Sequence, residues 1–167
     1  AAGALGLNME FSDLGDSPKE GSIEVRDLNN LPEDFEIGVD AAITGKASAE
    51  YIEAAVDLWR EKKIDAICTA PISKKAISLG GYDFPGHTEF LAEMTATKKF
   101  AMSFFAENLR VVLLSTHLPL LAAIDLIKKD RLIELIAFSD RELARLLGRK
   151  VSIAVAGLNP HASEGGM

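Results

Sequence analysis

Residues 47–76 read ASAEYIEAAVDLWREKKIDAICTAPISKKA, and they join a helix pattern to a strand pattern and then to a polar loop. In residues 47–63 apolar side chains recur at helical spacing, Ser48 can cap the start, and basic residues crowd the end. Residues 64–69 form a nearly continuous apolar run, which is typical of a strand that is covered on both faces. This order of helix, strand and loop predicts an α/β fold.

A pair of apolar segments further along the chain predicts a β-hairpin. Residues 100–105 and 109–115 have strand patterns, and Glu107 and Asn108 separate them. So short a polar connection favours antiparallel pairing. Because the buried strand at residues 64–69 favours parallel neighbours, we expect a mixed sheet.

The other expected elements are two helices and several short strands. The second helix carries a leucine-rich stripe and ends at Gly148, a residue type that often terminates helices. The helices are predicted at residues 118–128 and 131–147, and the strands at residues 23–25, 35–39 and 151–156.

The composition is that of a globular protein with about one domain, since 48% of the 167 residues are hydrophobic and 26% are charged. The 18 Lys and Arg against 25 Asp and Glu give a net charge of -7, so no nucleic-acid partner is expected. A single cysteine, Cys68, excludes an internal disulfide framework and favours a reducing compartment, for which we expect the cytoplasm. No apolar stretch approaches the roughly 18 to 20 residues that span a bilayer, so no membrane partner is expected.

Two histidines follow predicted strands. His117 comes directly after VVLLST, and His161 lies in the loop after VSIAVAG. The carboxyl ends of strands line the ligand crevice of open α/β sheets, and imidazole is a common ligand of divalent metals. Pro119 and Pro160 stiffen these loops, so the two histidines are candidate ligands of one metal site. The alternative for either is an ordinary surface or core histidine.

His87 and Thr88 begin a predicted helix after a glycine. Gly86 allows close backbone approach, and the first-turn N–H groups of the helix can receive a phosphate or carboxylate. The alternative is that Thr88 only caps the helix, with Glu89 and Glu93 on its solvated face.

The segment TAPISKKA supplies two lysines after the strand at residues 64–69. Pro71 ends that strand, and Lys74 or Lys75 can extend over the crevice, where an ammonium would neutralise a phosphate or assist proton transfer. The alternative is a solvated lysine at a helix start. Neither GxGxxG nor GxxxxGKS occurs, so a Rossmann fingerprint and a P-loop are both excluded.

The chain contains four long motifs: TAPISKKA (69–76), GYDFPGHTEFLAE (81–93), STHLPL (115–120) and GLNPHASEGG (157–166). Together they resemble the 4-hydroxythreonine-4-phosphate dehydrogenase family. The resemblance implies a fold similar to isocitrate and isopropylmalate dehydrogenases, with two α/β/α lobes, a mixed sheet and an active site completed at the interface of a homodimer. It makes this chain the middle part of that fold, with residues 1–80 in the first lobe and 81–167 in the second, dimerisation and metal-binding lobe. The opening LGLNMEF, residues 5–11, also resembles the family's first helix leading into its second strand.

The resemblance also implies a reaction and a set of site residues. The family uses NAD or NADP and a divalent metal (Zn, Mg or Co) to oxidise 4-phosphohydroxy-L-threonine, whose product loses carbon dioxide to give 3-amino-2-oxopropyl phosphate in pyridoxal 5'-phosphate biosynthesis. By this resemblance His117 and His161 are two of three metal ligands, His87 and Thr88 bind substrate, and Lys74 is catalytic.

The match to the family also has gaps. The family's third metal-ligand histidine lies in a downstream Tyr-His-Asp motif that this sequence lacks. We therefore expect the chain alone to bind metal weakly and to be inactive. Two other interpretations stay open: a dehydrogenase of D-threonate or D-erythronate 4-phosphate, and a non-catalytic α/β chain that dimerises or binds an anion. A zinc hydrolase is disfavoured because HExxH is absent.

Overall fold

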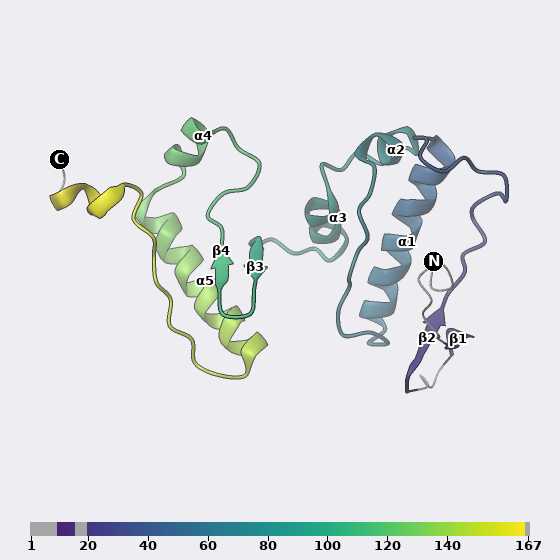
Figure 1. Cartoon of the computed structure of the whole chain (residues 1–167), viewed down its shortest axis with the longest axis horizontal. Helices are drawn as coiled ribbons and strands as arrows, with labels where there is room; N and C mark the ends of the chain where they lie inside the picture. The colour runs from purple at the N-terminus through teal and green to yellow at the C-terminus, as the bar shows by residue number, and fades with distance from the viewer. Residues whose placement is uncertain (1–9, 16–19, 166–167) are drawn as a thin grey trace. The chain divides into compact units, whose positions relative to one another are not determined.

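The computed structural model describes residues 10–15 and 20–165, which form two compact units with their boundary in the chain between Lys98 and Lys99 (Figure 1). The mixture of helices and strands confirms the α/β class. The lobe boundary expected between residues 80 and 81 concerns the complete family fold and stays a prediction. The first unit contains β1 (Glu10–Asp13), β2 (Ser22–Val25), α1 (Ala42–Arg60), α2 (Lys74–Leu79) and α3 (His87–Met94), and the second contains β3 (Ser103–Phe105), β4 (Arg110–Val112), α4 (Leu120–Asp125), α5 (Lys129–Leu147) and the 3-10 helix η2 (Pro160–Gly165).

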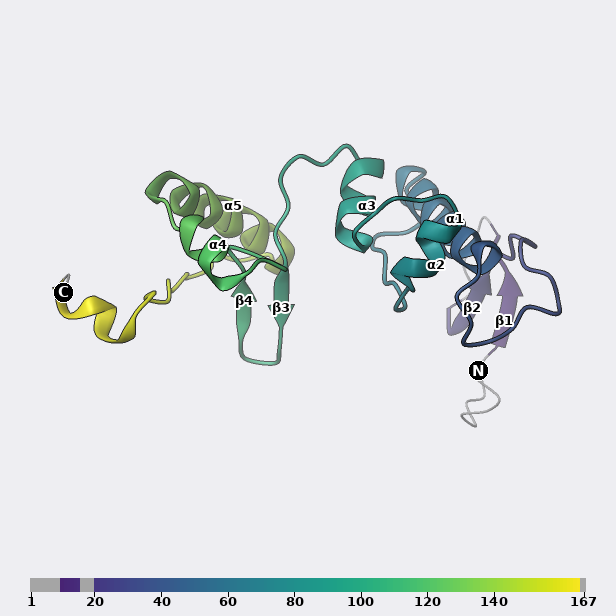
Figure 2. The same ribbon diagram turned by 90° about the horizontal axis from the view of Figure 1, so that it is seen from above.

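Helix α1 is the central element of the first unit, and α2 and α3 both lie beside it (Figures 1 and 2). The helix predicted at residues 47–63 is confirmed, but it begins earlier, after Ala41. Ser48 is therefore not the cap. It lies inside the helix, where its hydroxyl donates to the Thr44 carbonyl oxygen at 2.8 Å. The alanine-rich sequence before Ser48 favours helix, which explains the longer element.

Strands β1 and β2 form a parallel pair in which Phe11 lies opposite Ile23. This confirms the strand predicted at residues 23–25 and the strand at the end of the opening LGLNMEF, whose residues 5–9 lie outside the described part. The strand predicted at residues 35–39 is wrong, because a turn at residues 37–38 interrupts the segment and Gly38 has a left-handed backbone with φ of 87°.

The strands predicted at residues 64–69 and 151–156 are also wrong within the described part of the chain. Both segments are apolar, as their sequences indicate, but neither pairs with another described strand. A strand exists only as part of a hydrogen-bonded ladder, so an apolar pattern without a neighbour leaves an irregular segment. Val155, for example, is 60% exposed.

The hairpin of the second unit is confirmed in a shorter form. Strands β3 and β4 pair antiparallel with Phe104 opposite Val111, and the Ala106 N–H donates to the Leu109 carbonyl across the turn at 2.8 Å. The expected mixed sheet is not formed by the described residues, because the parallel pair β1–β2 and this antiparallel pair are separate sheets.

Helix α5 lies beside the hairpin (Figures 1 and 2), and both line one apolar hollow. Several apolar side chains of α5 are exposed. The helix ends at Gly148, as predicted, and Gly148 has a left-handed backbone with φ of 63°. Ser139 is its only buried residue, whereas Ile133 and Leu146 are 55% and 69% exposed. Helix α4 is shorter than the helix predicted at residues 118–128. No helix in the described ranges combines the length and apolar character of a membrane span.

Candidate functional site

Helices α1 and α2 touch backbone to backbone at two glycines. A Cβ on Gly45 would lie only 1.7 Å from the Ala76 carbonyl oxygen, and one on Gly80 would lie 2.5 Å from the Lys46 nitrogen. Larger residues would force the helices apart, so glycine is required at both crossings. The contact buries Ala76 and Ile77 and sets the position of α2, and with it Lys74, relative to α1.

Three polar side chains organise the start of α2. Ser73 is the N-cap, and its hydroxyl oxygen accepts from the Ala76 N–H at 3.2 Å. The same hydroxyl donates to the Asp40 carboxylate. The other oxygen of Asp40 lies 3.7 Å from the Lys75 ammonium. Lys74, between Ser73 and Lys75, is exposed at the first position of the helix.

Helix α3 is held against α1 by an aromatic cluster. Phe90 is 2% exposed and packs in one buried cluster with Ala49 and Ile52 of α1. The Phe84 ring stacks on Phe90 with 4.2 Å between centroids. These contacts determine where the start of α3 lies relative to α1.

Tyr82 joins the aromatic cluster to the acidic side of α1. Its ring lies 5.8 Å from that of Phe90, and its hydroxyl donates to the Glu53 carboxylate at 3.4 Å. Burial raises the pKa of Tyr82, and the negative charges of Glu53 and Glu50 raise it further. The phenol is therefore a neutral hydrogen-bond donor at neutral pH.

Lys74 and the start of α3 converge at Gly86. A Cβ on Gly86 would lie 4.0 Å from the Lys74 Cε and 3.5 Å from a Glu89 carboxylate oxygen. Gly86 is the N-cap of α3 and carries no side chain to bind the first-turn N–H groups, which include those of His87 and Thr88. The structure thus brings together three of the residues predicted from the sequence.

Two details of this helix start bear on the predictions. The alternative in which Thr88 caps the helix is wrong, because the cap is Gly86. The expected exposure of Glu89 and Glu93 is confirmed. In addition, the Nε2 atom of His87 is buried and has no hydrogen-bond partner among the described residues. A buried ring nitrogen without a hydrogen-bond partner is unusual in a folded protein.

The charges at this site favour an anion, with one opposing group. The ammonium of Lys74 and the positive end of the α3 dipole both attract negative charge. The Glu89 carboxylate, which lies next to Gly86, opposes a bound anion. A phosphate or carboxylate at this position would therefore displace the Glu89 side chain further into solvent, to which Glu89 is already exposed.

The two candidate metal ligands lie in the second unit. His117 lies in the loop between β4 and α4, and His161 lies in η2, and both side chains are exposed. Their backbones are left-handed, with φ of 55° and 53°, a conformation that costs roughly 1–2 kcal/mol in a residue other than glycine. Pro119 is the N-cap of α4 and Pro160 begins η2, so each proline lies at a helix start.

The described residues do not complete a metal centre. Among them, no group of three or more His, Cys, Asp or Glu side chains is placed to hold an ion. Imidazole is the right donor type, but two such ligands leave a divalent ion short of its coordination. The role of His117 and His161 stays a prediction.

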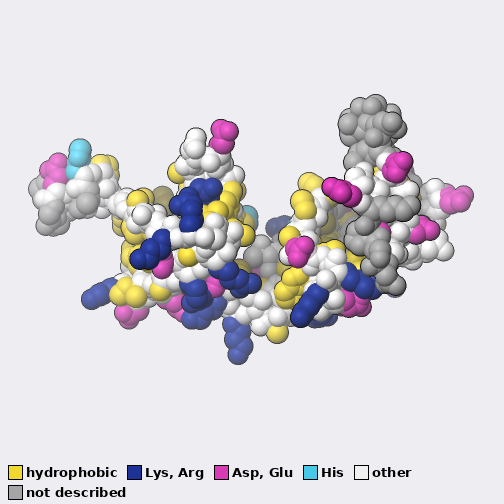
Figure 3. Space-filling view, turned by 90° about the horizontal axis from the view of Figure 1, so that it is seen from below, with side chains coloured by type: hydrophobic (Ala, Val, Ile, Leu, Met, Phe, Trp, Pro, Cys, Tyr) yellow, Lys and Arg dark blue, Asp and Glu magenta, His cyan; other side chains and the backbone are white. Residues whose placement is uncertain are grey.

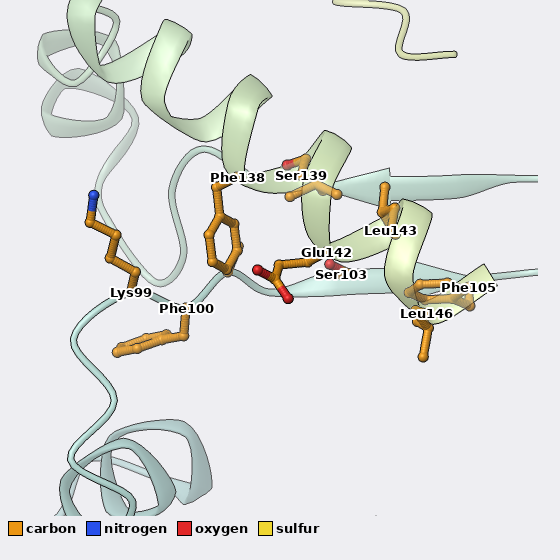
Figure 4. Close-up of a pocket in the computed structure, with 11 residues that line it drawn as sticks. Lys99, Phe100, Ser103, Phe105, Phe138, Ser139, Glu142, Leu143 and Leu146 are labelled. Atoms are coloured by element: carbon orange, nitrogen blue, oxygen red, sulfur yellow. The ribbon is translucent and has the colours of Figure 1, made fainter. Parts of the chain in front are cut away.

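The second unit also contains an apolar hollow of about 280 Å³ (Figure 4). Its walls come from the β3–β4 hairpin and α5, and Figure 3 shows that apolar side chains also reach the surface. The only charged side chains on the wall are Lys99 and Glu142, so the hollow lacks a set of converging catalytic groups. Its lining consists of Lys99, Phe100, Ala101, Ser103, Phe105, Val112, Phe138, Ser139, Glu142, Leu143 and Leu146.

Sequence reasoning missed the residues that position Lys74. Ser73 carries a recognisable signal, since a serine immediately before a helix is a common N-cap. Asp40 lies 33 residues before Ser73, and no local pattern pairs them. Gly45 and Gly80 look like weak points of helices in sequence, and only the structure shows the backbone contacts that they allow.

Comparisons with known proteins agree with the four motifs. The chain is 43% identical to the D-threonate 4-phosphate dehydrogenase of Cupriavidus necator over 149 residues, which are 89% of this chain and 45% of that protein. It is 40% identical to the 4-hydroxythreonine-4-phosphate dehydrogenase of Sulfurihydrogenibium sp., over 94% of this chain and 48% of that protein. The crystal structure of a 4-hydroxythreonine-4-phosphate dehydrogenase from Burkholderia phymatum matches with a TM-score of 0.83 and 36% identity, over 99% of this chain and 51% of that one.

The chain thus spans about half the length of these relatives. The family model described as Pyridoxal phosphate biosynthetic protein PdxA matches residues 2–167. The chain belongs to this PdxA family.

Proposed function

We propose that this chain supplies the phosphate-binding side of a dehydrogenase that acts on a phosphorylated hydroxy acid. One observation carries the proposal: the Lys74 side chain reaches the glycine that begins α3. A cationic side chain beside free first-turn N–H groups is the arrangement that phosphate monoesters require. Relatives of the same family that are named as dehydrogenases of phosphorylated acids support it.

In this proposal each residue of the site has a separate task. The α3 N–H groups of His87 and Thr88 donate hydrogen bonds to phosphate oxygens. Lys74 is the catalytic residue, whose ammonium neutralises the anion and assists proton transfer at the reacting end of the substrate.

The proposed substrate is 4-phosphohydroxy-L-threonine, which would be oxidised with NAD or NADP and decarboxylated to 3-amino-2-oxopropyl phosphate for pyridoxal 5'-phosphate. D-threonate 4-phosphate is the second candidate substrate, and the 43% identity of this chain to a D-threonate 4-phosphate dehydrogenase supports it. The substrates differ in an amino group, so a chimera tests the choice. This chain would replace the matched segment of the Cupriavidus necator relative, and the rates of NAD reduction with the two substrates would be compared.

Metal, assembly and location complete the proposal. His117 and His161 would be two ligands of a divalent ion, Zn, Mg or Co, which when bound would polarise the substrate hydroxyl. We also propose a homodimer with the active site at the subunit interface and a cytoplasmic location.

Isothermal titration of the chain with zinc tests the proposed metal ligands. His117→Ala and His161→Ala should each weaken zinc binding. Affinity equal to that of the unmodified chain would refute this assignment.

Binding of inorganic phosphate to the 167-residue chain tests the central proposal, with ³¹P NMR as the measurement. Lys74→Met should raise the dissociation constant at least about fivefold, because a close charge contributes on the order of 1 kcal/mol. Lys63→Met is the matched control, since Lys63 is an exposed lysine in an ion pair with Glu61. Glu89→Gln should tighten binding about twofold or more by removing the opposing charge. Equal affinities of the Lys74 and Lys63 variants would overturn the proposal.

A further inference from the structure

We propose that Asp40 is a positioning residue that holds Lys74 against the start of α3, acting through Ser73 and Lys75. The inference rests on the proposed function, in which Lys74 meets the substrate. Asp40 touches neither Lys74 nor the anion site in the contacts described above, so its effect passes through the backbone of α2.

The contacts of Asp40 lie on both sides of Lys74. One carboxylate oxygen accepts the hydrogen bond from the Ser73 hydroxyl, and the other lies 3.7 Å from the Lys75 ammonium. Ser73 and Lys75 are the residues immediately before and after Lys74. A single carboxylate therefore restrains both chain neighbours of the catalytic lysine.

The start of α2 depends on this restraint more than the rest of the helix does. Gly45 and Gly80 hold the middle and the end of α2 against α1 through backbone contacts. The first turn of a helix as short as α2, with six residues, frays easily when its cap is not fixed. Ser73 supplies the cap, and Asp40 fixes the orientation of the Ser73 hydroxyl.

Lys74 has no side-chain contact that would hold it in place by itself. Within the described residues its ammonium makes no hydrogen bond or ion pair, and the side chain is exposed. Its direction toward Gly86 is therefore set by the backbone to which it is attached. Asp40 precedes α1 by two residues, so its contacts join the start of α1 to the start of α2.

The contribution of Asp40 to stability is expected to be small. Its side chain is 35% exposed and that of Lys75 is 76% exposed, and ion pairs between such groups contribute little to folding. Loss of Asp40 should therefore leave the thermal unfolding midpoint nearly unchanged while it loosens Lys74. This combination separates a positioning role from a general structural one.

The first test is the proximity of Lys74 to Gly86, measured by NMR as the nuclear Overhauser effect between the Lys74 ε-protons and the Gly86 α-protons. Asp40→Ala should remove the signal. Ser73→Thr, which retains both contacts of Asp40, should keep the signal, and Asp40→Asn, which retains the hydrogen bond to Ser73 but loses the ion pair with Lys75, should only weaken it. Asp57→Ala is the matched control, since Asp57 pairs with Arg60 at 3.0 Å on α1. A signal that survives in Asp40→Ala would overturn the inference.

The second test is phosphate affinity in a double-mutant cycle. Asp40→Ala should weaken binding of inorganic phosphate about threefold to fivefold in the unmodified chain and have no effect in the Lys74→Met background. Equal weakening in both backgrounds would show that Asp40 does not act through Lys74. If Lys74→Met alone left phosphate binding unchanged, the proposed function would fail, and the NMR signal would still decide the role of Asp40.

Discussion

Replacing Gly45 by alanine tests whether the contact between α1 and α2 is as close as the structure shows. The new Cβ would lie 1.7 Å from the Ala76 carbonyl oxygen, 2.0 Å from its carbonyl carbon and 2.6 Å from the Ile77 nitrogen. All three are backbone atoms, so no side chain can rotate away to make room. An ordinary contact distance of about 3.5 Å requires the helices to separate by roughly 2 Å at this point.

Two opposing effects determine how much Gly45→Ala changes the free energy of unfolding. Overpacking of this kind costs about 1–3 kcal/mol, and if α2 instead detaches, exposure of Ile77 costs about 1.5–3 kcal/mol. Alanine inside a helix is favoured over glycine by about 1 kcal/mol. We therefore expect Gly45→Ala to lower the free energy of unfolding, by up to about 2 kcal/mol. Helix propensity alone predicts the opposite sign.

The assay is urea unfolding followed by the fluorescence of Trp59, which is the only tryptophan and lies on α1. Gly15→Ala is the control, because its Cβ would meet only ordinary contacts, 3.8 Å from a Glu24 carboxylate oxygen, and its effect should stay within about 0.5 kcal/mol. A Gly45→Ala chain at least as stable as the unmodified one would refute the backbone contact. It would also remove the argument that Gly45 sets the position of Lys74.

Three further predictions concern other parts of the chain. Gly148→Ala should destabilise α5 by about 1 kcal/mol in thermal unfolding, because Gly148 has a φ of 63°. The hydrogen bond from Lys99 and, next, its charge lower the pKa of Glu134, so Lys99→Met should raise this pKa back toward its usual 4.5 in an NMR titration. The stabilisation of the fold by this pair should be present above pH 4.5 and be lost as the pH falls through the lowered pKa. The pKa of Tyr82 is raised above its usual 10.0, so its stabilisation should be complete below pH 10 and be lost as the pH rises through the raised value, and Tyr82→Phe should abolish this loss in urea midpoints measured between about pH 9 and pH 11.

The sequence predicts those elements whose signals are local. The stripe and the terminal glycine of α5 are sufficient to place it, and the two-residue polar turn at Glu107 and Asn108 is sufficient for the hairpin. Strands at residues 64–69 and 151–156 have equally strong apolar patterns, yet they lack partners among the described residues. Strand formation depends on neighbours distant in sequence, which a local pattern does not contain.

The residues of the candidate site also fall into those that local sequence signals reveal and those that they do not. Lys74, His87 and Thr88 could be selected from the sequence because each starts a helix that follows a loop, and the structure brings them together. Their supporting residues could not, because the pair Asp40 and Ser73 is separated by 33 positions. The supporting contacts are tertiary, so only the packing of α2 and α3 on α1 reveals them.

The proposed anion site and the proposed metal ligands differ in how far this chain builds them. The residues of the proposed anion site are held by contacts within residues 40–90, where Asp40 and Gly45 position α2 and Phe90 positions α3. The described residues around His117 and His161 contain no three-ligand group, and both side chains are exposed. Since pre-organised contacts determine affinity, the chain alone should bind phosphate through its first unit much as the complete fold does, while its zinc affinity should be weak. Phosphate and zinc titrations of the same preparation therefore measure separately which half of the site the chain forms by itself.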